Sequence, residues 1–147
     1  MEMAELRERF DAVDRRIASL LAEEGVVVLR YSLALIFIWF GGLKLIGGSP
    51  AVALVAETVY WFDPAWFVPV LGAWELLIGL CFLYRPLIRA AIALLAPQML
   101  GTFLPFLLLP ATTFEQFPLL LTLEGQYIMK NLVVIGAAMV VGGTVRR

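Results

Sequence analysis

The chain has 147 residues, of which 62% are hydrophobic, and its formal net charge is −1. Its mean hydropathy is +0.92. A soluble domain of this length would expose too much apolar surface, so the composition predicts an integral membrane protein of one domain and no nucleic-acid partner. There is no histidine, and Cys81 is the one cysteine. This excludes a histidine-ligated haem, a Cys/His metal site, an internal disulfide and a Cys–His catalytic pair.

The first 25 residues predict an amphipathic helix outside the membrane. Apolar side chains recur at alternating spacings of three and four residues and form one stripe. The stripe consists of Met3, Leu6, Phe10, Val13, Ile17 and Leu20. It could lie on the membrane surface, pack on the bundle or form a coiled coil with a second copy. Because the polar face is mixed and mildly acidic, we expect protein contact, with Gly25 as the break before the membrane.

Four apolar segments predict membrane crossings, at about residues 26–46, 66–84, 88–109 and 126–143. Gly47 and Gly48 should end the first crossing, and a short helix is expected at about residues 51–60. Pro97 and Pro105 predict a kink in the third crossing, and residues 110–124 read as a loop. The fold class we predict is an all-α membrane protein. It is a four-transmembrane-helix bundle (26–147) preceded by an N-terminal cytoplasmic amphipathic helix (1–25).

The orientation of the bundle follows from its arginines. The loops at residues 50–64 and 110–124 contain no basic residue, whereas the N-terminal segment, the middle turn and the C-terminus are basic. The arginines on that side are Arg7, Arg9, Arg15, Arg16, Arg85, Arg89, Arg146 and Arg147. The positive-inside rule therefore predicts that both termini lie in the cytoplasm. We expect a multi-pass protein of the bacterial plasma membrane, surrounded by the lipid bilayer.

Glu75 interrupts an otherwise uncharged span from Trp66 to Tyr84, about ten residues from its outer end. A charge at that depth is costly unless it is paired, protonated or hydrated. Gln98 lies at a similar depth on the next crossing, and other polar groups lie in the outer half of the bundle or in its loops. The candidate ligand-binding residues are Glu75, Lys130, Lys44, Gln98, Glu57, Glu124, Asn131 and Trp74.

Two interpretations of this polar set remain open. In the structural one, Glu75 pairs with Lys130 or Lys44, and Gln98 and Asn131 supply hydrogen bonds between helices. In the functional one, a lysine and a carboxylate line a pocket that binds a small head group or passes a proton. The glycines Gly72 and Gly79 are expected at close helix contacts under either interpretation.

Three stretches resemble the DoxX-like superfamily of small four-crossing bacterial membrane proteins. They are FIWFGGLK at Phe37–Lys44, GAWELLIG at Gly72–Gly79 and LEGQYIMKNL at Leu123–Leu132. Ser49-Pro50 and the loop from Phe114 to Pro118 also look like the YkgB/RclC-type branch, which is linked with resistance to reactive chlorine species. The resemblance implies a subunit of a quinone-linked oxidoreductase, a part of an oxidative-stress complex or an assembly chaperone. Without histidine, a redox role would mean quinone binding or partnership with a redox-active subunit.

The leading hypothesis is therefore an accessory redox or stress-resistance membrane protein with a polar pocket for a quinone-like or other small ligand. One rival is a non-catalytic assembly module that recruits a membrane or redox partner, or a second copy, through the N-terminal helix. Another is a small oligomeric transporter, since four crossings leave little room for alternating access in a monomer. A self-contained enzyme is disfavoured, because the sequence contains no visible nucleophile–base pair or metal set.

Overall fold

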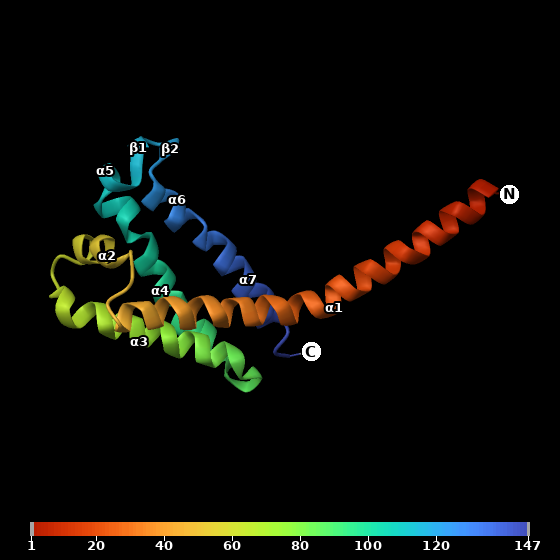
Figure 1. Ribbon diagram of the computed structural model, residues 1–147, viewed down its shortest axis with the longest axis horizontal. Coiled ribbons are helices and arrows are strands. Elements are labelled where there is room, and N and C mark those ends of the chain that lie inside the picture. The colour runs from red at the N-terminus through yellow and green to blue at the C-terminus, as the bar shows by residue number, and fades with distance from the viewer. Residues whose placement is uncertain (1, 147) are drawn as a thin grey trace.

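The computed structural model describes residues 2–146, which form a helical bundle with one long helix projecting from it (Figure 1). Four helical segments within this range are long and apolar enough to cross a membrane, namely Glu5–Leu45, Pro64–Leu83, Arg85–Leu108 and Leu123–Gly143. The elements are α1 (Glu2–Leu45), α2 (Val52–Thr58), α3 (Pro64–Leu83), η1 (Arg85–Leu87), α4 (Ile88–Leu108), α5 (Pro110–Thr113), β1 (Phe114–Gln116), β2 (Leu120–Leu121), α6 (Leu123–Met129) and α7 (Asn131–Gly143). The helical membrane fold predicted from the sequence agrees with this arrangement.

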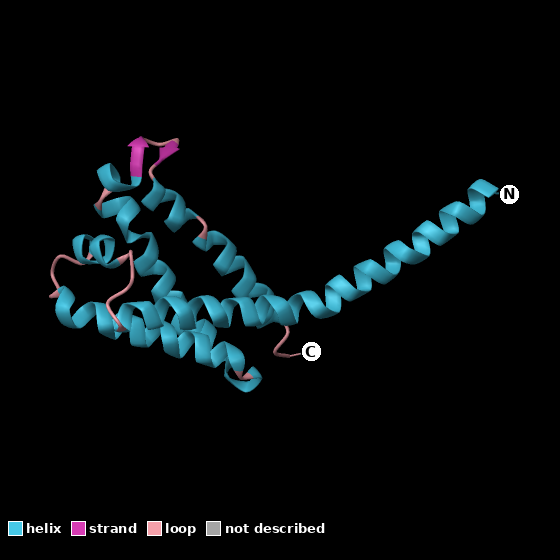
Figure 2. Ribbon diagram, viewed as in Figure 1, coloured by secondary structure: helices cyan, strands magenta, loops and turns pink. Residues whose placement is uncertain are grey.

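Helix α1 does not end at Gly25. The amphipathic segment and the first crossing form one continuous helix from Glu2 to Leu45, so the predicted break is wrong. A single glycine costs a helix only about 1 kcal/mol relative to alanine, and the helix-compatible residues on both sides outweigh it. The N-terminal half of α1 leaves the bundle as a rod, with a bend where it departs (Figures 1 and 2).

The C-terminus of α1 is set by glycine, as the sequence predicts. Gly47 has a φ of 75°, in the left-handed region that glycine adopts without strain. The backbone N–H of Gly48 donates to the carbonyl of Leu43 at 2.9 Å, which is the bond expected of a Schellman motif. This stop turns the chain sharply one turn after Lys44 and leads it into α2.

Two other boundaries differ from the prediction because capping residues start the helices earlier. The Asp63 carboxylate accepts a hydrogen bond from the Ala65 N–H at 2.9 Å, and Pro64 takes the first helical position of α3. The Thr122 hydroxyl oxygen accepts from the Gly125 N–H at 3.1 Å, so α6 begins at Leu123 rather than near residue 126. The loop before α6 contains a short antiparallel hairpin, β1–β2, where we expected no regular structure (Figure 2).

The core is concentrated towards one end of the bundle. We call this the basic end, because it contains η1, the C-terminus and the exposed Arg85, Arg89 and Arg146. Buried side chains from α1, α3, α4 and α7 meet there, including Ala34, Ile78, Phe82, Ala91 and Val141. The opposite end, which we call the loop end, contains α2, α5 and the hairpin. Helix α2 contacts both α3 and α4 at the loop end (Figure 1).

Candidate functional site

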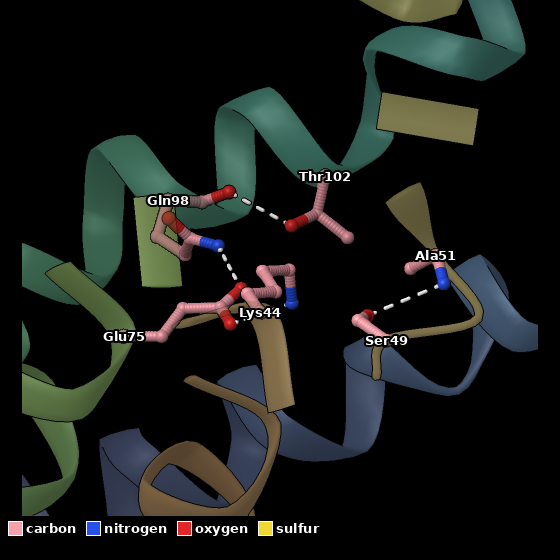
Figure 3. A network of polar contacts seen from close by, with 6 residues as sticks. All are labelled: Lys44, Ser49, Ala51, Glu75, Gln98 and Thr102. Carbon is pink, nitrogen blue, oxygen red and sulfur yellow. Dashed lines mark hydrogen bonds and ion pairs between the residues drawn. The ribbon is translucent and has the colours of Figure 1, made fainter. Parts of the chain in front are cut away.

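A buried ion pair joins the two most closely packed helices, α1 and α3. The Lys44 Nζ lies 2.7 Å from Oε2 of Glu75, and the two side chains are 7% and 9% exposed. The Gln98 Nε2 of α4 donates to the other carboxylate oxygen, Oε1, at 2.7 Å. Figure 3 shows the Glu75 carboxylate held between these two partners. Both of its oxygens are therefore occupied, and Lys44, rather than Lys130, is the lysine that pairs with Glu75.

Glycines bring the ion pair together. Gly41 and Gly72 each lie three residues before the charged residue of their helix, on the same helix face. A Cβ at Gly41 would come within 2.6 Å of the Gly72 carbonyl oxygen, and one at Gly72 within 2.8 Å of the Gly41 carbonyl oxygen. Side chains on either glycine would push the helices apart, so these glycines fix the distance that Lys44 and Glu75 span. Gly79 makes a similar contact with Ala34, which confirms the close contacts expected at Gly72 and Gly79.

The third member, Gln98, is positioned by its own helix. Pro97 precedes it within α4, and the hydroxyl of Thr102 donates to the backbone carbonyl of Gln98 at 2.9 Å (Figure 3). The neighbouring Trp74 ties α3 to α4, since its indole N–H donates to the Leu94 carbonyl at 3.1 Å. Trp74 therefore supports the helix that presents Gln98 to Glu75.

A cavity of about 620 Å³ adjoins the ion pair. Its walls come from α1, α2, α3, α4, α6 and α7, and most of the side chains that line it are apolar. The polar side chains that line it are Lys44, Thr58, Glu75, Gln98, Thr102, Tyr127, Lys130 and Asn131, together with the indole of Trp74. The cavity lies towards the loop end, where the helices no longer form a dense core.

The second lysine of the site lies at a one-residue interruption of the fourth crossing. Helices α6 and α7 meet at Lys130, whose φ of −61° and ψ of −17° stay in the helical region, so the single fourth crossing that the sequence predicts runs from Leu123 to Gly143. The Asn131 Nδ2 donates to the carbonyls of Tyr127 and Ile128, at 3.3 and 3.0 Å, and so satisfies acceptors at the interruption. The Lys130 ammonium lies 3.8 Å from the centre of the Tyr127 ring. Within residues 2–146 Lys130 takes part in no ion pair.

The structure brings together six of the eight predicted site residues. Glu75, Lys44, Gln98, Trp74, Lys130 and Asn131 line the cavity. Glu57 and Glu124 are exposed and do not line it, because α2 and the start of α6 turn these carboxylates to the surface. Sequence reasoning missed Tyr127, Thr58 and Thr102. Helical spacing offered a signal for two of them, since Thr102 lies four residues after Gln98 and Tyr127 three residues before Lys130.

Comparison of the chain with protein-family models, with curated proteins and with solved structures finds no match. Among the described residues, no group of three or more histidine, cysteine, aspartate or glutamate side chains is placed to hold a metal ion. The chemistry of the site therefore has to be argued from its own donors. The site combines two features. Both carboxylate oxygens of Glu75 already have partners in the ion-pair network, and a second lysine, Lys130, lines the wall of a mostly apolar cavity.

Proposed function

We propose that this chain is an inner-membrane protein that binds a small amphiphilic ligand in the cavity near its loop end, with a quinone as the first choice. The observation that carries the proposal is the cavity of about 620 Å³ with Lys130 in its wall. Sites for small molecules typically measure about 300–1,000 Å³ and combine apolar walls with a few polar groups. This cavity fits that description in size and in lining.

The donors in the wall suit a quinone. Its carbonyl oxygens accept hydrogen bonds, and Lys130 and Tyr127, whose ammonium and hydroxyl groups are donors, both line the cavity. Lys44 donates to Glu75 with one of its three N–H groups and keeps two. The apolar walls from α3, α4 and α7 would take the ring and the first part of an isoprenoid tail, whose remainder would extend into lipid.

The resemblance to the DoxX-like superfamily supports a role beside redox chemistry. Under this proposal the chain is an accessory to quinone-linked oxidation or to oxidative-stress resistance. The distribution of arginines favours a cytoplasmic basic end, which places the cavity in the outer half of the membrane. The electrons would come from, or pass to, a redox-active partner subunit.

A second function, an assembly module without a ligand, is favoured by the completeness of the buried network. Both oxygens of Glu75 have partners, and every buried side-chain nitrogen and oxygen within the described residues is hydrogen-bonded. A network satisfied in this way can serve to fix helix register alone. The two functions make different demands on Lys130. A ligand would need it, whereas the Lys44–Glu75–Gln98 network does not include it.

Quenching of tryptophan fluorescence tests the proposal, because Trp74 lies in the cavity wall. A variant with Trp74 as its only tryptophan would be placed in nanodiscs and titrated with a short-tailed quinone. We expect saturable quenching, with an affinity at least tenfold weaker in Lys130→Met. Glu124→Gln is the matched control, since it removes a charge six residues before Lys130 that lies outside the cavity. Equal quenching in all three proteins would refute a site that depends on Lys130.

A further inference from the structure

The N-terminal half of α1 presents an apolar stripe that nothing in the described chain covers. Its six side chains are between 51% and 73% exposed. They are Met3, Leu6, Phe10, Val13, Ile17 and Leu20. The neighbouring Leu21 is 69% exposed. Because this part of α1 projects away from the bundle, the other helices do not reach the stripe (Figure 1). A contiguous apolar surface of this kind marks an interaction site.

The spacing of the stripe selects a helix as its partner. Its residues alternate three and four apart over nearly three heptads, which is the 3.5-residue repeat of a two-stranded coiled coil. In heptad notation Met3, Phe10 and Ile17 occupy a positions, and Leu6, Val13 and Leu20 occupy d positions. The stripe is thus as narrow as a coiled-coil seam, except where Leu21 widens it near the bundle.

The charges beside the stripe disfavour a lipid surface. Residues 3–24 contain six acidic and four basic side chains. The acidic ones are Glu5, Glu8, Asp11, Asp14, Glu23 and Glu24, and the basic ones are Arg7, Arg9, Arg15 and Arg16. The cytoplasmic surface of a bacterial membrane is anionic and attracts basic segments, so a net acidic helix is repelled by it.

The same charges fit a second copy in parallel. Arg9 occupies a g position and Asp14 the following e position, and these two positions face each other across a parallel pair of helices. Two Arg9–Asp14 ion pairs then flank the seam, one on each side. An antiparallel pair would instead bring Arg9 of one copy opposite Arg16 of the other. Two copies in one membrane also extend α1 from the same face, which favours the parallel arrangement.

We propose that the N-terminal half of α1 forms a parallel two-stranded coiled coil with the same segment of a second copy, making the protein a homodimer. The continuity of α1 connects this dimer to the membrane bundle without a loop, because the helix that carries the seam also carries Lys44. The dimer does not depend on the ligand proposed for the cavity.

Disulfide trapping in the full chain tests the proposal. The protein would be reconstituted in lipid, with Cys81→Ala removing the native thiol. We expect oxidation to trap Leu20→Cys as a dimer, because d positions of parallel partners face each other. Ser19→Cys, on the outward face one residue away, is the control and should give at most a tenth of that yield. In an antiparallel pair Leu20 would lie opposite Met3 and would not be trapped.

A charge exchange supplies the second measurement. Asp14→Arg should raise the dimer dissociation constant at least tenfold, because it places two arginines opposite each other on both sides of the seam. The exchange Arg9→Asp with Asp14→Arg should restore the constant to within about threefold. Equal trapping at residues 19 and 20, or failure of the exchange to restore what Asp14→Arg removes, would overturn the parallel dimer. Protection of the stripe by vesicles of anionic lipid, without trapping, would assign it to the membrane and overturn it as well.

Discussion

Removing one member of the Lys44–Glu75 pair should cost far more stability than removing both. The ammonium and carboxylate lie 2.7 Å apart and are almost fully buried. With an effective dielectric constant of about 20, two charges at this distance attract each other by about 6 kcal/mol. Their desolvation offsets much of that attraction, but a single substitution leaves the other charge buried without its partner. We therefore expect Lys44→Met to lower the free energy of unfolding by about 3–5 kcal/mol.

The double variant distinguishes this explanation from a simple loss of contacts. Lys44→Met with Glu75→Gln leaves no charge, and the new amide can still bond to Gln98, so we expect a loss of about 0–1 kcal/mol. Reversible unfolding in mixed micelles, followed by circular dichroism, measures Lys44→Met, Glu75→Gln and the double variant. The control is Lys130→Met, which removes an exposed ammonium outside the ion pair and should cost less than about 1 kcal/mol. If the two single costs add in the double variant, the pair is not coupled and the reasoning fails.

Three further predictions concern close contacts, and the same unfolding assay checks them. Gly41→Ala should destabilise the bundle by about 1–3 kcal/mol, because its Cβ meets backbone atoms of α3. Gly42→Ala, one residue away, meets nothing within 4 Å and should be neutral or stabilising by up to about 1 kcal/mol; equal losses at both positions would contradict the packing argument. Gly125→Ala should cost more than about 1 kcal/mol, since its Cβ would collide with the Thr113 carbonyl, whereas a tolerated alanine would show that α5 is free to move. Trp74→Phe should lower the free energy of unfolding by about 1 kcal/mol, because the hydrogen bond to the Leu94 carbonyl is lost. An unchanged free energy of unfolding would show that this hydrogen bond does not stabilise the bundle.

The sequence predicts the membrane helices well because their signal is strong and local. Each crossing needs about 20 apolar residues, and glycine, proline and capping residues mark where the crossings stop. Gly47 ended α1 as expected because only its left-handed backbone could close the helix there. The prediction of a helix end at Gly25 was wrong for the opposite reason. Gly25 adopts no left-handed conformation, and its small cost cannot interrupt a helix that is favoured on both sides.

The site was only partly predictable, because its assembly depends on how the helices rotate against each other. Hydropathy alone revealed that Glu75 needs a partner. The choice of Lys44 over Lys130 depends on the glycine contact between α1 and α3, which brings these two helices closer than any third helix. The depth in the membrane is similar for both lysines in a sequence-based estimate, so the packing decides between them. Tyr127 escaped notice for a related reason, since an aromatic residue near the end of a crossing is normally part of the interfacial belt.

The position of the ion pair explains how a small bundle can carry both charges and a cavity. Towards the basic end, Phe37 and Ile78 belong to a dense apolar core, and a void there would cost stability directly. Towards the loop end, the side chains around the cavity are not packed against one another in this way. Glycine contacts and the Lys44–Glu75 bond hold α1 against α3 at this transition, and Gln98 extends the bond to α4. The network therefore ties three helices together beside the cavity, and Lys130 lines the same cavity outside that ion pair.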